Sequence, residues 1–304
     1  MPSCVFLNTF YDGFLKQVYA DESLAEKTYS EQLAALNYPC FGDSDFYSSG
    51  LAKAGFDTWD FVINCAPSQI QWARENHVEA KSLFDVIEAQ VERCSPDVIY
   101  IQDLNVFSRV HLERLKAKTK LVVGQIASPL GQQVPLDLYD IMISSFPHFV
   151  ERFNAGGVKS YYQPLAFDPR VLERLEPLER SVELSFVGGI SALHSKGTQV
   201  LAQCAERVPL DIWGYGAEAL PADNILRQHH HGPVFGLDLF SAFARSKITL
   251  NRHIDVAENN ANNMRLYEAT GCGALLITDA KDNLHELFEV GKEVLAYQTP
   301  KEAV

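Results

Sequence analysis

The feature that most constrains the fold is an alternation of strand-like and helix-like segments along the chain. In the first half, amphipathic segments such as Ser82–Arg93 and Arg109–Lys116 lie between short apolar runs, which are Cys4–Asn8, Asp60–Asn64, Val98–Gln102, Leu121–Gly124 and Ile141–Ser144. A chain that alternates in this way builds parallel sheets with helices on both faces. We therefore expect an α/β protein.

The segment Tyr162–Arg180 interrupts this alternation with three prolines and a dense run of charge. Such a segment is typical of a connection between domains. We expect two doubly wound, Rossmann-like domains facing across a cleft. The first covers residues 1–165 and the second covers residues 181–304, with 166–180 as linker and hinge.

The alternation begins again in the second half. Its segments are the strands Glu183–Val187, Leu210–Trp213, Lys247–Asn251, Ala274–Thr278 and Glu293–Ala296, and the helices Thr198–Arg207 and Leu237–Ser246. The chain stops soon after the last strand, where Pro300 begins what reads as another helix. A domain of this kind normally carries one or two more helices, so we expect it to be truncated or unusually short.

Composition narrows the possible partners and location. The 304 residues are 47% hydrophobic and 21% charged, which is ordinary for a globular protein, and the net charge of −13 argues against binding nucleic acid through its phosphates. No apolar run is long enough to span a bilayer, and no signal peptide is evident at the start. The six cysteines form no CxxC pair, which favours reduced thiols and a cytoplasmic protein.

The most informative motif is Lys247–Asp279, which reads as strand, polar loop, short helix, glycine turn and strand. Asn262 or Asn263 can cap the helix, which would run to about Thr270. Arg265 and Glu268 would share its polar face, while the apolar positions Met264, Tyr267 and Ala269 would pack inward.

Ligands of open parallel sheets bind beyond the carboxyl ends of the strands, where helix N-termini attract anions. Asn251 and Arg252, together with the helix start at Asn263, would therefore hold a diphosphate. Glu268 would accept hydrogen bonds from a ribose. The alternative is that Arg265 and Glu268 form a plain surface ion pair.

Glycines follow two other predicted strands. One set is Gly188 and Gly189, with Lys196 nearby, and the other is Gly214 in the stretch Ile212–Gly216. Glycines at these places would let the backbone approach a phosphate or a base. Neither stretch is a G-x-G-x-x-G or Walker motif. Ordinary turns are the alternative at both places.

Candidates in the first half are less specific. Asp12 can act as a general base toward an acceptor hydroxyl or simply cap a helix, and His148 can touch the donor sugar or be a structural histidine. Tyr11, Asp103 and Gln125 also follow predicted strands. We expect no metal, because His229–His231 is better read as a solvated turn and the acidic pair Asp43 and Asp45 lies in a polar loop.

Several stretches resemble one known family. The sequence NNMRLYEATGCGALLITD (262–279) is similar to the donor-site signature of group 1 glycosyltransferases, in particular the CgeB-like, spore-maturation-type family. SFVGGIS, HSKG and DIWGYG in the second half, and YPCFGDSDFYSSGLAKAG, DFVINCAPSQIQWARENH and PDVIYIQDLN in the first, fit the same resemblance.

The resemblance implies a two-Rossmann-domain glycosyltransferase (the GT-B type) that needs no metal or other cofactor. It would take a nucleoside-diphosphate sugar as donor and a hydroxyl group of a glycan, protein or small molecule as acceptor, often with retention of configuration. By this resemblance, Glu268 would bind the donor ribose, and Arg252 and the helix start at 262–265 would bind the diphosphate. Gly188, Gly189 and Lys196 would line the donor pocket. The family's usual pair of glutamates is incomplete, because Asn260 stands eight positions before Glu268.

Two other functions remain open from the sequence. A sugar-nucleotide epimerase shares the two-domain architecture and would convert a donor without any acceptor. A non-catalytic module that binds a sugar nucleotide or a glycan has the same binding requirements.

Overall fold

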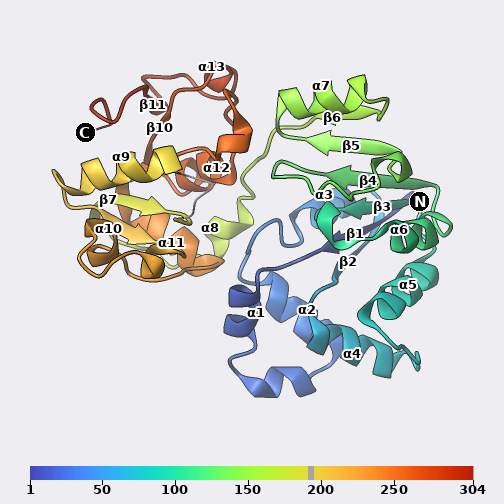
Figure 1. The fold of residues 1–304 in the computed structure, drawn as a ribbon. Helices are drawn as coiled ribbons and strands as arrows, with labels where there is room; N and C mark the ends of the chain where they lie inside the picture. Colours follow the sequence, from blue (N-terminus) through green and yellow to red (C-terminus); the bar gives the residue numbers. More distant parts are fainter. Residues whose placement is uncertain (191–194, 304) are drawn as a thin grey trace. The chain divides into compact units, whose positions relative to one another are not determined.

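The computed structural model describes residues 1–190 and 195–303, apart from the side chains of 195–197, and the chain divides into two compact units (Figure 1). Unit 1 is Met1–Gln163 and unit 2 is Pro164–Val304. Each unit contains one parallel sheet with helices packed against it. The predicted α/β fold with two doubly wound sheets is confirmed.

The sheet of unit 1 has the order β2-β1-β3-β4-β5-β6. Its strands are β1 Ser3–Asn8, β2 Asp57–Val62, β3 Val98–Ile101, β4 Leu121–Gln125, β5 Ile141–Ser144 and β6 Ser160–Tyr162. Its helices are α1 Asp12–Val18, α2 Tyr29–Asn37, α3 Phe46–Lys53, α4 Ala66–Glu75, α5 Leu83–Cys94, α6 Arg109–Lys116 and α7 Pro147–Ala155. The prediction placed β2 three residues late, because this edge strand begins with polar residues that give no apolar signal.

The sheet of unit 2 has the order β11-β10-β9-β7-β8. Its strands are β7 Val182–Val187, β8 Asp211–Trp213, β9 Ser246–Leu250, β10 Leu275–Asp279 and β11 Val294–Tyr297. Its helices are α8 Arg170–Arg174, α9 Ser195–Ala205, α10 Ile225–Gln228, α11 Leu237–Arg245, α12 Met264–Gly271 and α13 Leu284–Leu287. The helix predicted from Pro300 is wrong up to Ala303, where the chain forms a turn closed by Glu302 N–H to Thr299 O at 3.0 Å.

The segment 166–180, predicted to be a linker, packs onto unit 2. The Phe167 ring lies against Gly271, where an added Cβ would come within 2.4 Å of it. The Arg180 guanidinium donates to Ser246 O at 2.9 Å and to Cys272 O at 3.1 Å. These contacts fix the segment to the start of β9 and to the end of α12, so it is a structural part of the second unit.

Candidate functional site

The carboxyl ends of β7 and β9 mark the point where the order of strands reverses in unit 2. The chain goes from β7 to β8 on one side of β7, and then to β9 on the other side. Loops that leave two such strands diverge and open a crevice, which is where α/β proteins bind ligands. Gly188 and Gly189 follow β7, and Asn251 and Arg252 follow β9. Four of the predicted residues, Gly188, Gly189, Asn251 and Arg252, therefore lie at the switch point of the sheet.

Arg252, which follows β9, connects that strand end to the segment after β7. Its side chain is buried, with the residue 6% exposed, and its Nη2 donates to Gly189 O at 2.9 Å while Nη1 donates to Thr198 Oγ1 at 2.7 Å. The guanidinium carbon lies 5.0 Å from the centre of the Phe186 ring. Burial lowers the pKa of Arg252 to about 10, so it is a cation at neutral pH.

Asn251 and Asn263 hold the start of α12 against β9. Asn263 Nδ2 donates to Asn251 Oδ1 and to Arg252 O, both at 3.0 Å. Asn263 Oδ1 accepts the N–H of Leu266 at 3.3 Å, which confirms Asn263 as the helix cap. Asn251 Nδ2 also donates to Thr278 Oγ1 at 2.9 Å. Both amides therefore fix the position of the helix N-terminus.

Arg265 and Glu268 form an i,i+3 ion pair between Nη1 and Oε2. Arg265 Nε also donates to Val187 O at 2.8 Å, so this arginine reaches the end of β7. Glu268 is 7% exposed, so this carboxylate is buried. Arg265 and Glu268 share one face of the helix as predicted, but the alternative of a plain surface pair is wrong, because Glu268 is buried. Pairing with a guanidinium makes a carboxylate tolerable in that buried position.

The glycines at this edge allow two strand ends to pass each other closely. Beyond the strands, Gly188 N–H donates to Trp213 O and Ile190 N–H donates to Tyr215 O, both at 2.8 Å. A Cβ at Gly214, whose φ is +134°, would lie 2.2 Å from Gly188 O. These glycines therefore have a packing role between the ends of β7 and β8. Lys196 lies in α9, and its side chain is outside the described residues.

We predict that Gly216→Ala destabilises the protein by about 3 kcal/mol, because it combines backbone strain with a clash. Its φ is +96°, and a Cβ would lie 1.9 Å from Ile190 O. Gly232→Ala is the matched control, since its φ is +103° but no atom lies within 4 Å of the added Cβ. Urea denaturation of both variants measures the clash as the difference between them. If both variants lost the same stability, the close approach of Gly216 to Ile190 O would be contradicted.

The unit 1 candidates do not form one cluster. Asp12 is the exposed first residue of α1, just beyond β1, and Tyr11 is the N-cap. His148 is in α7 beyond β5, with its ring 5.3 Å from that of Phe146. Two strands lie between β1 and β5. At the usual strand spacing, the segments that follow β1 and β5, which carry Asp12 and His148, are therefore about 14 Å apart. At the switch point of this sheet, Thr9 Oγ1 instead donates to Asp103 Oδ2 at 3.1 Å.

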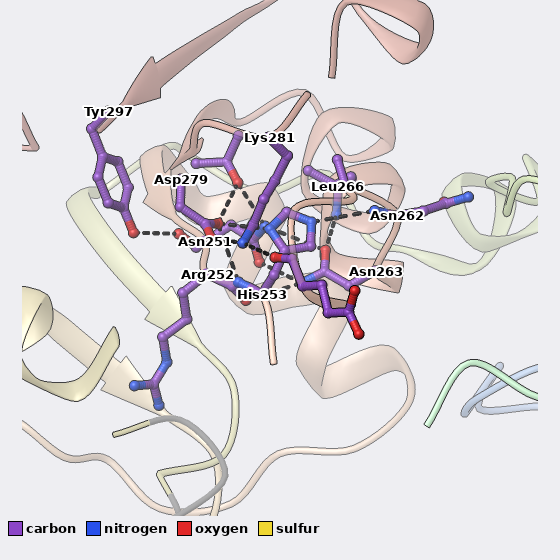
Figure 2. A network of polar contacts seen from close by, with 12 residues as sticks. Asn251, Arg252, His253, Asn262, Asn263, Leu266, Asp279, Lys281 and Tyr297 are labelled. Atoms are coloured by element: carbon purple, nitrogen blue, oxygen red, sulfur yellow. Dashed lines mark hydrogen bonds and ion pairs between the residues drawn. The ribbon is translucent and has the colours of Figure 1, made fainter. Parts of the chain in front are cut away.

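Two residues near the unit 2 site were missed by the sequence analysis. Figure 2 shows His253 directly against Asp279, with Nδ1 2.6 Å from Oδ1, and Arg252 pointing away from this pair. The His253 side chain is completely buried. The signal was present in the sequence, because Asp279 ends the apolar strand β10 and β10 pairs with β9. Neighbouring parallel strands end at the same edge of a sheet, which brings the two residues together.

The remaining candidates have structural roles. His230 Nε2 lies 2.6 Å from Gly214 O and His231 Nε2 lies 2.5 Å from Asp211 Oδ1, because 229–232 pairs with β8 as an extra extended segment. Asp43 accepts from Gln102 Nε2 at 3.1 Å. Among the described residues, no group of three or more His, Cys, Asp or Glu side chains is placed to hold a metal ion. Nor does the described part of the chain contain a helix with the length and apolar character needed to span a membrane.

Comparisons with known proteins bear on the fold and on the sequence of the second unit. Residues 197–304 match the model of a family described as glycosyl transferase-like. The structure is similar to AviGT4, a glycosyltransferase involved in avilamycin A biosynthesis, with a TM-score of 0.56 and 14% identity over 100% of this chain and 87% of that one. A search of curated proteins finds no significant match.

Two further solved structures are similar at low identity. One is the DNA-modifying enzyme β-glucosyltransferase, whose substrate is uridine diphosphoglucose, with a TM-score of 0.54 and 11% identity over 100% of this chain and 86% of that one. The other is UDP-GlcNAc 2-epimerase from Neisseria meningitidis bound to UDP-GlcNAc, with a TM-score of 0.50 and 10% identity over 94% and 85%. The chain therefore has the GT-B fold of these glycosyltransferases and epimerases, and its residues 197–304 are glycosyl transferase-like in sequence.

Proposed function

We propose that the protein is a glycosyltransferase that moves a sugar from a nucleoside-diphosphate sugar to a hydroxyl acceptor without a metal ion. The observation that carries the proposal is the meeting of Arg252, Arg265 and the start of α12 at the ends of β7 and β9. The family match over 197–304 supports it, because that range contains all three. The similar structures that use UDP-sugars make a uridine diphosphate sugar the first donor to test.

The chemical demand of the reaction is the negative charge that develops on the departing diphosphate. Arg252 and the helix N-terminus supply positive charge and N–H donors fixed before the ligand arrives, which is an efficient way to stabilise such a charge. Glu268 neutralises Arg265 in part, and we assign it to the ribose hydroxyls of the donor. Asp12 or His148 of unit 1 would serve the acceptor hydroxyl or the sugar.

A thermal-shift screen with uridine, guanosine, thymidine and adenosine diphosphate sugars tests donor binding. A specific ligand at 100 times its dissociation constant adds about 2.7 kcal/mol of stability. We expect one base to raise the melting temperature by several degrees. If every nucleotide leaves the melting temperature unchanged, the donor assignment is wrong.

Product analysis separates transfer from epimerisation, the second candidate, which the similarity to UDP-GlcNAc 2-epimerase favours. An epimerase converts the sugar nucleotide alone, whereas a transferase consumes it only when a hydroxyl acceptor is present. We expect acceptor-dependent release of the nucleoside diphosphate. Retention is the expected stereochemical outcome, and the anomeric proton coupling of the product checks it.

A further inference from the structure

The loop 252–263 carries two of the groups proposed to bind the donor, with Arg252 at its first position and the helix cap Asn263 at its last. The segment Asp279–Asn283 holds this loop along its length. The contacts are His253 N–H to Asp279 Oδ1 at 3.1 Å, Lys281 Nζ to Glu258 O at 2.7 Å, Asp282 N–H to Asn259 O at 3.1 Å, and Asn283 to the backbone of Ala261 at 2.6 and 3.0 Å.

One buried imidazole joins the two ends of the loop. The N–H of Asn262 donates to His253 Nε2 at 3.3 Å, so Nε2 carries no proton and Nδ1–H donates to Asp279. Burial alone would raise the pKa of Asp279, but the hydrogen bond from His253 and the nearby positive charge of Lys281 hold it below its usual range. The carboxylate is therefore an anion that fixes both the ring orientation and the tautomer.

The ring connects directly to the two groups that would bind the diphosphate. His253 follows Arg252, and Asn262 precedes Asn263, whose side chain caps α12 and donates to Arg252 O. Figure 2 shows these residues in one connected network. A change in the His253–Asn262 contact would therefore alter the spacing between the Arg252 backbone and the helix N-terminus.

We propose that His253 is a positioning residue, which sets the distance between the Arg252 cation and the N-terminus of α12 so that both contact one diphosphate. Asp279 acts through His253 by holding its ring. The inference rests on the proposed function and deepens it, because it names what makes the diphosphate site rigid. Neither residue needs to touch the substrate for this role.

The test compares His253→Ala, His253→Gln and Asp279→Asn by titration calorimetry with UDP. We expect His253→Ala to weaken UDP binding by about tenfold or more, as fixed groups lose their preorganisation. His253→Gln retains one acceptor and one donor and should recover part of the affinity. Asp279→Asn retains the acceptor for Nδ1–H, so its effect should lie between the wild type and His253→Ala.

Two controls separate positioning from general loss of stability. Leu226→Ala removes a side chain from the unit 2 core, where Leu226 is 1% exposed, and we expect it to lower stability without weakening UDP binding. Hydrogen exchange provides a readout without ligand: His253→Ala should speed exchange at the Asn262 and Leu266 amides, and Leu226→Ala should not do so selectively.

The inference is overturned if His253→Ala weakens UDP binding no more than Leu226→Ala does, or if exchange at these amides does not change. If the wild-type protein binds no UDP, the proposal that its donor is a uridine diphosphate sugar is wrong. The hydrogen-exchange measurement would still decide whether His253 fixes the loop 252–263.

Discussion

Replacement of Glu268 by alanine should weaken donor binding by roughly 10- to 150-fold, which corresponds to the loss of charge-assisted hydrogen bonds of about 1.5–3 kcal/mol. In the structure, one carboxylate oxygen of Glu268 pairs with Arg265, and Glu268 is buried. The reason for the loss is that a ribose hydroxyl would have no charged acceptor. Calorimetry with UDP measures the effect, and Glu268→Gln should lose less because an amide oxygen still accepts.

Glu183→Ala is the matched control for this change. Glu183 also pairs with a cation, Lys247, but its side chain is 73% exposed. Exposed pairs contribute little to stability, so both the melting temperature and the UDP affinity should stay near the wild-type values. If Glu268→Ala binds UDP as the wild type does, Glu268 has a structural role only and the ribose assignment fails.

Replacement of Arg252 by alanine should lower the free energy of unfolding by about 2–4 kcal/mol and abolish donor binding. The change leaves Gly189 O without its donor and opens a cavity over the Phe186 ring. Urea denaturation gives the free energy of unfolding, and calorimetry at a temperature where the variant is folded gives the binding.

Arg252→Lys and Arg207→Ala complete this experiment. Lysine keeps the charge but lacks the planar fork that reaches Gly189 O and Thr198 Oγ1 together, so it should recover only part of the stability. Arg207 is exposed in the same unit, and its removal should change the free energy of unfolding by less than about 0.5 kcal/mol. If Arg252→Ala also lost less than about 0.5 kcal/mol, the hydrogen bonds from Arg252 to Gly189 O and Thr198 Oγ1 would not stabilise the protein as we infer.

The alternation of segments was enough to predict both sheets, because buried parallel strands are short apolar runs that stand out from amphipathic helices. β5 and α6 have the predicted bounds, and Asn263 caps α12 as expected. β6 was missed because its three residues are mostly exposed and carry no apolar pattern. Strand length and edge position therefore limited the prediction.

The candidate site was predicted in part for a similar reason. Placement at the carboxyl ends of strands follows from the order of elements, and the structure brings Gly189 and Arg252 into contact there. The burial of Glu268 could not be predicted, because it depends on how α12 packs between α11 and β10. The role of Gly214 was also hidden, since a close approach to Gly188 O arises only when two strands far apart in sequence are paired.

The position of β7 has a consequence for synthesis of the protein on the ribosome. β7 is the first strand of unit 2 to be made, yet it lies between β8 and β9, and residue Val182 pairs with Ser246. About sixty residues must leave the ribosome before its second edge is covered, and an uncovered apolar strand is prone to aggregate. Nascent chains that end before Leu250 should therefore depend on chaperones, whereas chains that extend past β10 should not.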